Sequence, residues 1–281
     1  MVLDTLVKFW LLGMLAVLGA WEFAAPRRTP TEGRGLRWPT NLTIWSLNAL
    51  LVTVPIAPVA LAVAGAGRGW GLLNQADASL PLAVAIAIAV VALDGLGYLQ
   101  HRVLHASSVL WRVHRVHHAD VDLDATTGLR FHPIEALVTH ATLVVGIIVL
   151  GLPPLGVAVY LGLAAGITIL THANVRFPSA IESHAGWLVV TPALHALHHS
   201  VLPAESERNF ATIVSVWDRL GSTYCAQPMG RHESLRAGLE EFREPRYLTL
   251  PWTLALPFCA SRPVSAGNEP GAAAPPSVLT G

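Results

Sequence analysis

Long apolar stretches separated by short polar segments dominate the first 170 positions of the chain. Four regions have the length and polarity of membrane spans, which need about 20 mostly apolar residues: 2–23, about 41–64, 80–99, and 134 to about 170. Gly151, Pro153 and Pro154 divide the last region into two short halves, and Pro55 and Pro58 are expected to kink the second region. The pattern predicts an all-α integral membrane protein with about three single spans and a helical hairpin.

Basic residues in the connecting segments indicate how the chain is oriented. The segments after the first and third spans contain four arginines each, whereas the loop after the second has only Arg68. We therefore expect residues 100–133 and the chain after the hairpin to form a helical cap on the cytoplasmic side. Residues 1–79 are expected to form N-terminal membrane anchor helices and 80–250 a second domain. The tail 259–281, rich in Pro, Gly, Ala and Ser, is expected to be disordered.

The composition agrees with a membrane protein and excludes several other classes. Hydrophobic residues make up 53% of the chain and charged residues only 13%, against about 25% charged in an average soluble domain. The 18 basic and 18 acidic residues balance, which argues against a nucleic-acid partner held by a basic patch. Cys225 and Cys259 alone cannot build a disulfide framework or a cysteine-ligated zinc module. The single Lys8, with arginine as every other basic residue, hints at a GC-rich bacterial genome and hence a bacterial inner membrane.

Histidine is the unusual residue of this chain: there are 13, and most are grouped between residues 101 and 199. His101 and His105 stand four residues apart, and an H-x-x-H-H pattern occurs at 114–118 and again at 195–199. On a helix this spacing puts the imidazoles of each group on one face. Neutral imidazole binds iron, copper, zinc and nickel, and eight such ligands exceed the three that a catalytic zinc uses. The pattern predicts a nitrogen-ligated site for two metals just below the cytoplasmic leaflet.

Other polar residues are placed around this predicted site. Asp94 and Tyr98 share a helix face with His101 and His105, since the spacing between them is four, three and four residues. A carboxylate deep in an apolar span is costly and usually functional. We expect Asp94 to orient a ligand imidazole, with a hydrogen bond to another helix as the alternative.

The two ends of the predicted hairpin supply further candidates. His132 precedes Pro133, which begins the first hairpin helix, and Glu135 lies in its first turn, a favoured place for an acid. His172 ends the hairpin where the chain returns to the cytoplasm. His132 and His172 therefore lie at the level of the other histidines and are expected as metal ligands. His140, two turns inside the hairpin, is instead expected to line a lipid channel or to bond within its helix.

These residues resemble the motifs of the fatty acid hydroxylase/sterol desaturase family of integral-membrane oxygenases. The resemblance covers about residues 90 to 225, with the motifs in the same order. The matching residues are Asp94, Tyr98, His101-Arg-Val-Leu-His105, Trp111-Arg-Val-His114-Arg-Val-His117-His118, Arg130-Phe-His132-Pro-Ile-Glu135, His172-Ala-Asn174, His195-Ala-Leu-His198-His199-Ser200, and Arg208-Asn209-Phe210 with Trp217-Asp218-Arg219-Leu220-Gly221-Ser-Thr-Tyr224.

The resemblance implies a catalytic domain at 80–250 with a di-iron centre, which uses O2 and two electrons to hydroxylate or desaturate a lipid C–H bond. It places nine histidines at positions that are metal ligands in the family. His132 matches a family histidine whose role as a ligand is less firmly held. The nine are His101, His105, His114, His117, His118, His172, His195, His198 and His199. Some members have a further histidine where this chain has Thr168, so one metal has a smaller ligand set here or His132 completes it. The catalytic residues expected beside the metals are Asp94, Tyr98, Glu135 and Asn174.

The expected partners follow from the same resemblance. The lipid substrate enters from the bilayer, and the electrons come from a separate ferredoxin or a cytochrome b5-like protein. Zinc is an alternative occupant in a given preparation, because it binds imidazole at least as well as ferrous iron does. A zinc-dependent membrane hydrolase and a b-type haem membrane protein stay open as alternative functions, and the identity of the lipid is open as well.

Overall fold

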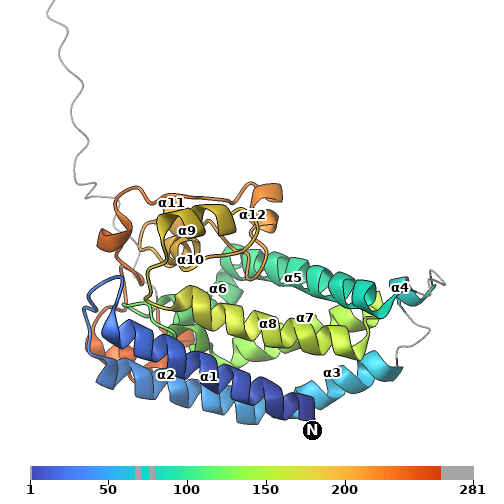
Figure 1. The fold of residues 1–281 in the computed structure, drawn as a ribbon. Helices are drawn as coiled ribbons and strands as arrows, with labels where there is room; N and C mark the ends of the chain where they lie inside the picture. The colour runs from blue at the N-terminus through green and yellow to red at the C-terminus, as the bar shows by residue number, and fades with distance from the viewer. Residues whose placement is uncertain (1, 67–70, 76–79, 261–281) are drawn as a thin grey trace, which may run out of the picture.

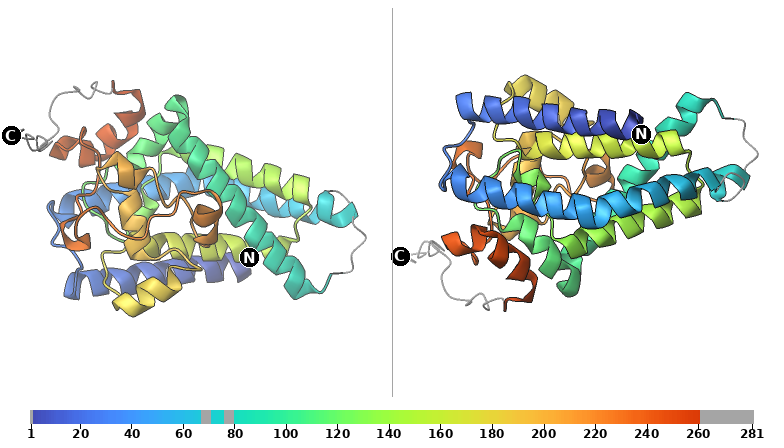
Figure 2. Two further views of the ribbon diagram at one scale, coloured as in Figure 1. Left: turned by 90° about the horizontal axis from the view of Figure 1, so that it is seen from above. Right: turned by 90° about the horizontal axis from the view of Figure 1, so that it is seen from below.

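The computed structural model describes residues 2–66, 71–75 and 80–260, and within them the chain is helical without named strands. The long helices are α1 (Val2–Ala24), α2 (Arg34–Asn48), α3 (Val54–Ala66), α5 (Leu82–Ala106), α7 (Pro133–Leu150) and α8 (Pro154–His172). They form one bundle, with the short α4 (Leu72–Gln75) at one end and a group of short elements at the other (Figures 1 and 2). The predicted all-α fold is confirmed. The expected disordered tail lies outside the described residues beyond 260.

The short elements form the cap, which carries much of the chain after α5. Its helices are α6 (Ser108–His118), α9 (Ser179–Ala185), α10 (Pro192–His198), α11 (Pro203–Ser206), α12 (Val216–Leu220) and α13 (Leu250–Ala255). Short η turns join them at Thr127–Leu129, His232–Ser234, Pro245–Leu248 and Leu256–Phe258. Figure 1 shows α9, α10, α11 and α12 gathered over the ends of α5 and α8.

Four helical segments are long and apolar enough to cross a membrane: Arg34–Ala66, Leu82–Ala106, Pro133–Leu150 and Pro154–His172. The hairpin is present as expected, because α7 ends at Gly151 in the left-handed conformation (φ 68°) and Pro154 begins α8. The second span differs from the expectation in that it begins at Arg34 and continues as a helix through its prolines. A wider π-helical turn, η1 (Ala49–Thr53), precedes Pro55 and makes room for a ring that an α-helical turn would not accommodate.

Small side chains let the spanning helices approach one another closely. Ala89 and Leu93 of α5 are buried against Ile147 and Val157 of the hairpin. At Gly156 an added Cβ would lie 2.6 Å from the Cβ of Ala89, so only glycine permits this approach. Within a bilayer such van der Waals contact, rather than a hydrophobic driving force, holds helices together. The hairpin is therefore fixed against α5. The start of α7 and the end of α8 lie at the level of the cap.

A buried ion pair network ties the N-terminal helices to the loop that follows the second histidine group. Arg37, 1% exposed, donates from its Nη2 to Asp120 Oδ2 at 2.9 Å and from its Nη1 to Asp124 Oδ2 at 2.7 Å. Burial alone would raise the pKa of the Asp120 carboxyl, but the charge of Arg37 outweighs it and holds that pKa at about 2. The separate N-terminal domain stays a prediction, yet its second helix is bonded directly into the cap.

We expect the substitution Arg37→Leu to destabilise the protein by about 3–5 kcal/mol, because it leaves Asp120 and Asp124 buried without their counter-charge. The matched control is Arg236→Leu, which removes an exposed ion pair with Glu240 and is expected to cost under about 1 kcal/mol. Thermal unfolding of both variants in the same detergent gives the comparison. Equal stability losses would contradict a structural role for the buried network.

Candidate metal centre

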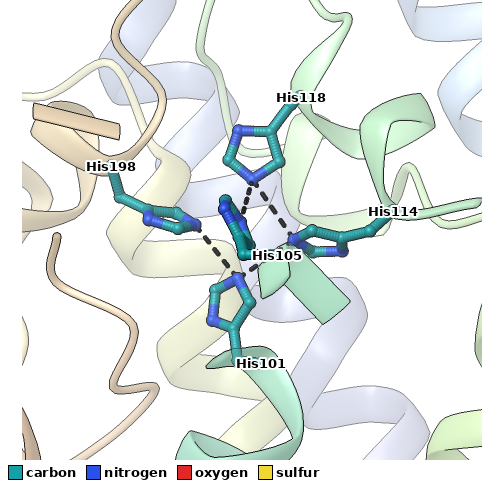
Figure 3. A group of neighbouring side chains, drawn as sticks. All are labelled: His101, His105, His114, His118 and His198. Atoms are coloured by element: carbon teal, nitrogen blue, oxygen red, sulfur yellow. Dashed lines mark hydrogen bonds between the residues drawn. The ribbon is translucent and has the colours of Figure 1, made fainter. Parts of the chain in front are cut away.

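Nine histidines from four parts of the chain converge at the cap end of the bundle. They separate into a five-histidine cluster and a four-histidine cluster, and within each cluster the potential ligand atoms lie within 4.8 Å of one another. The five-histidine cluster consists of His101, His105, His114, His118 and His198, and Figure 3 shows their rings pointing toward a common centre. The four-histidine cluster consists of His117, His172, His195 and His199.

Each H-x-x-H-H group is divided between the two clusters. On α6, His114 and His118 point into the five-histidine cluster and His117 into the other. The reason is helical phase: a residue four positions along lies about 40° from the first, whereas one three positions along lies about 60° away on the other side. The second group, at the end of α10, divides in the same way. Residues expected on one stripe therefore serve two adjacent centres.

Backbone carbonyls fix the orientation of several imidazoles. His101 donates from Nδ1 to the carbonyl oxygen of Phe210 at 2.7 Å, and His198 donates from Nδ1 to that of Arg208 at 2.8 Å. A carbonyl oxygen only accepts, so in a neutral ring the proton is on Nδ1 and Nε2 presents a lone pair. The Nε2 atoms of His101 and His198 nevertheless lie 3.0 Å apart. Two lone pairs at that distance repel unless a cation lies between them, which is the arrangement that a metal ion requires.

Burial keeps the clustered imidazoles neutral. In the cap it lowers the pKa of five clustered histidines well below the usual range, and the neighbouring imidazoles lower it further. These five are His117, His118, His195, His198 and His199. The neutral ring is the form that coordinates a metal. The donor set therefore fits transition-metal ions that prefer nitrogen ligands, including iron and zinc.

Glu135 supports the five-histidine cluster directly. Its Oε1 accepts a hydrogen bond from His114 Nδ1 at 2.6 Å, and both side chains are buried. A carboxylate on the outer nitrogen fixes the tautomer and raises the basicity of the nitrogen that faces the metal. Glu207 lies at a longer 3.3 Å from His105 Nδ1, and its side chain is 57% exposed. The sequence reading missed Glu207, because nothing in its spacing relates it to a histidine about a hundred residues away.

The four-histidine cluster is held differently. His172 donates from Nδ1 to the carbonyl oxygen of Thr168 at 2.7 Å, and its Nε2 lies 3.0–3.1 Å from the Nε2 atoms of the other three rings. The Nδ1 atoms of His117, His195 and His199 are buried and have no hydrogen-bond partner among the described residues. His172 is therefore the central member of this cluster, and the absence of a histidine at position 168 leaves four ligands for it.

His132 is not brought into either cluster, so the expectation that it is a metal ligand is not supported. It is the N-cap of α7, where its Nδ1 accepts a hydrogen bond from the Ile134 N–H at 3.1 Å. Its Nε2 lies 3.3 Å from the carbonyl oxygen of Leu254. Because both ring nitrogens are engaged in this way, the ring stabilises the start of the hairpin rather than a metal.

The hydrogen bonds of Asp94 go to the cap and not to an imidazole, so the expectation that it orients a ligand is not supported. Its carboxylate accepts hydrogen bonds from the backbone N–H groups of Ile213 and Val214 and from Trp217 Nε1, at 2.9–3.1 Å. The cap folds back along α5, so these donors reach the carboxylate before any histidine does. The alternative, a hydrogen bond to another helix, is met at Trp217 of α12, and Ile213 and Val214 belong to the segment that precedes this helix.

The other two expected catalytic residues also make structural contacts. The Tyr98 hydroxyl lies 3.1 Å from Thr223 Oγ1. Asn174 accepts from the Arg28 N–H through Oδ1 and donates to the Arg28 carbonyl oxygen through Nδ2. Its own backbone N–H donates to Glu22, a buried acid of α1 that the sequence reading did not single out. These hydrogen bonds position the segments that carry the histidines, and a catalytic role for Tyr98 or Asn174 stays a prediction.

Comparison with known proteins gives a consistent result for the central part of the chain. Residues 86–223 match the sequence model of the fatty acid hydroxylase family. The chain is 35% identical over 140 residues to an ornithine lipid hydroxylase of Rhizobium tropici, covering 50% of this chain and 41% of that protein. It is 26% identical over 128 residues to an alkylglycerol monooxygenase of Xenopus tropicalis, covering 45% and 27%.

A third relative is a Delta(7)-sterol 5(6)-desaturase of Aspergillus fumigatus, 28% identical over 131 residues, with 45% of this chain and 35% of that protein covered. The chain thus spans less than half the length of these relatives. No solved structure matches the chain. The resemblance drawn from the histidine motifs is confirmed for the region that contains both clusters.

We expect the substitution His172→Ala to remove the metal of the four-histidine cluster, because the Nε2 of His172 is the atom common to its close contacts. After dialysis against a chelator, elemental analysis should give about half the metal of the wild-type protein. His132→Ala is the matched control and should keep the wild-type metal content. A loss of metal from His132→Ala would restore His132 as a ligand.

Glu135→Gln tests the carboxylate that contacts His114. Losing a partner of this kind typically weakens metal binding by about 10–100-fold. In a competition titration with a chromophoric chelator, we expect this loss of affinity for the metal of the five-histidine cluster. The other half of the bound metal should keep its affinity. Glu207→Gln is the control, and its effect should be smaller because Glu207 is exposed and more distant from its histidine. The same affinity in both variants and in the wild type would show that Glu135 does not support the metal.

Proposed function

Because residues 86–223 of this chain match the sequence model of the fatty acid hydroxylase family, we propose that the protein is a membrane oxygenase that uses two irons and O2 to hydroxylate or desaturate a lipid. The observation that supports this most directly is the convergence of nine imidazoles into two adjacent clusters. Two neighbouring centres with nitrogen ligands suit a dinuclear iron site. The names of the relatives, which are lipid hydroxylases, monooxygenases and a desaturase, support a lipid as the substrate class.

The residues of this chain would prepare the site in three ways. The nine imidazoles would hold two irons, which when bound supply the activation of O2 and the oxidising power needed for an unactivated C–H bond. Glu135 and the carbonyls of Arg208 and Phe210 hold the Nδ1 protons, so that the Nε2 lone pairs face the metals. The ring of Phe210, 4% exposed, lies edge-on to three rings of the five-histidine cluster at 5.0–5.5 Å and keeps water away from them.

The substrate and the electrons would reach this site from different sides. Large apolar side chains on the outer faces of the long helices, such as Val91, Leu99 and Val145, are about half exposed and suit contact with lipid. We propose that the lipid enters laterally from the bilayer. The two electrons for each turnover would come from a separate ferredoxin or cytochrome b5-like protein. The arginine-rich segments at the cap end suggest a cytoplasmic cap in a bacterial inner membrane.

The alternative functions are less consistent with the geometry. A b-type haem needs two axial histidines with a free plane between them for the porphyrin. Here five potential ligand atoms surround one centre within 4.8 Å and leave no such plane. A zinc-dependent hydrolase would use three ligands and an open position at each metal, fewer than either cluster offers. The requirement for O2 separates this hydrolase from the proposed oxygenase.

Purified protein in lipid nanodiscs, loaded with iron and supplied with a reduced ferredoxin, should consume O2 in step with the appearance of a modified lipid. Mass spectrometry should show a lipid that has gained one oxygen atom or lost two hydrogens. His198→Ala should reduce this product to background, whereas His184→Ala, which alters an exposed histidine, should leave it unchanged. Lipid cleavage by the zinc-loaded protein without O2 would contradict the proposed function and favour the hydrolase.

A further inference from the structure

The side of the cap that lies against α5 is built from two backbone segments, 186–190 and 213–220, which we call the cap edge. The segments pair along their length: Val190 N–H donates to Ile213 O at 2.9 Å, and Ser215 N–H donates to Leu188 O at 3.0 Å. Arg219 closes the pair by donating from Nη2 to Gly186 O at 3.2 Å. The cap edge is therefore one rigid unit, and the position of any part of it fixes the rest.

This unit is attached to the middle of a membrane-spanning helix. Asp94 accepts hydrogen bonds from Ile213, Val214 and Trp217 of the cap edge. The ring of Trp217 also packs on Gly95, where an added Cβ would lie only 3.0 Å from it. In Figure 1, α12 lies over α5 rather than beyond its end. The cap edge thus follows the side of the helix.

The depth of this attachment follows from helix geometry. Asp94 is the twelfth residue after Leu82, the start of α5, which corresponds to a rise of about 18 Å. The hydrocarbon core is about 30 Å thick, and any tilt of α5 shortens the rise along the membrane normal. The apolar run of α5 starts at Leu82, which we therefore place at the far boundary of the core. The level of Asp94, and with it the cap edge, therefore lies below the near boundary of the hydrocarbon.

The outward surface of the cap edge has the chemistry that this depth requires. Trp187, Leu188 and Leu220 are 67%, 62% and 72% exposed, an unusual grouping for a surface in water. Arg219 lies between them, with its guanidinium 4.2 Å from the centroid of the Trp187 ring and 3.5 Å from that of the Tyr224 ring. The charge of Arg219 is thus held by these rings and by the Gly186 carbonyl. The exposed aromatic and aliphatic side chains beside it are typical of a membrane interface.

We propose that the cap edge is inserted into the bilayer leaflet on the histidine side, with Trp187, Leu188 and Leu220 in contact with acyl chains. Lipid, rather than a second copy of the chain, is the expected occupant because the cap edge is bonded to Asp94 of the same spanning helix that exposes the apolar Val91 and Leu99. This inference depends on the membrane-spanning helices and not on the proposed reaction.

Insertion would also bring lipid close to the candidate metal centre. Phe210 donates its backbone N–H to Asp218 of the cap edge, and its ring contacts His101 and His198. A lipid lying along the cap edge would therefore be separated from the five-histidine cluster by few residues.

The test uses single-cysteine proteins that carry an environment-sensitive fluorophore, in the background Cys225→Ser and Cys259→Ser. Leu188→Cys and Leu220→Cys report on the cap edge, Val91→Cys is the lipid-facing reference, and Glu240→Cys is the water-facing reference. Each metal-loaded protein is placed in nanodiscs of phosphatidylcholine and phosphatidylglycerol. Fluorescence is quenched either by lipids with a nitroxide on the acyl chain or by iodide in the water.

We expect the labels at 188 and 220 to behave like that at 91, with iodide quenching several-fold weaker than at 240 and strong quenching by the nitroxide lipids. Iodide quenching equal to that at 240 would place the cap edge in water and overturn the inference. Protection from both quenchers, together with disulfide cross-linking of Leu220→Cys between chains, would show that a second copy covers the surface and would overturn it equally. Retained metal content confirms that each variant is folded.

Discussion

The repulsion between imidazole lone pairs is the constraint on which the rest of this structure depends. Where backbone carbonyls hold the Nδ1 protons, as at His101 and His198, the Nε2 atoms must face each other 3.0 Å apart without a proton between them. Such an arrangement favours a cation between the two rings and needs a scaffold that prevents the rings from turning away. The helices that supply the rings come from segments far apart in sequence, so the whole bundle must be held in register.

Hydrogen bonds and ion pairs of buried acids hold many of these segments in position. Asp120 and Asp124 hold Arg37 of α2, Glu22 of α1 accepts the N–H groups of Ala125 and Asn174, and Asp94 of α5 accepts those of the cap edge. Glu22 and Asp94 satisfy backbone donors of loop and cap segments, and Asp120 and Asp124 satisfy a buried guanidinium. All of these donors would otherwise be unpaired in an apolar environment. Among these buried acids Glu135 is different, because its partner is itself a histidine of the five-histidine cluster. Most of these buried acids therefore stabilise the fold, whereas the imidazoles are the potential metal ligands.

The proposed membrane position of the cap explains why this scaffold is largely apolar outside as well as inside. If the cap edge lies in the leaflet, the proposed lipid substrate reaches the protein without passing through water, and the large exposed side chains on α5 and on the cap both contact acyl chains. The histidine clusters then lie near the boundary between hydrocarbon and headgroups, within reach of the proposed lipid substrate and of the proposed electron donor.

The sequence alone determined the helical class, the hairpin between Pro133 and His172, and the nine histidines, because apolar length and histidine spacing are local properties that a chain displays directly. It did not determine how the two H-x-x-H-H groups divide between clusters, nor that Glu135 rather than Asp94 supports an imidazole, nor that His132 caps a helix. Those outcomes depend on which donors and acceptors meet when α6, α10 and the cap edge fold back on α5 and α8. Only the tertiary structure decides that, because a hydrogen bond depends on distances between atoms that the order of residues does not specify.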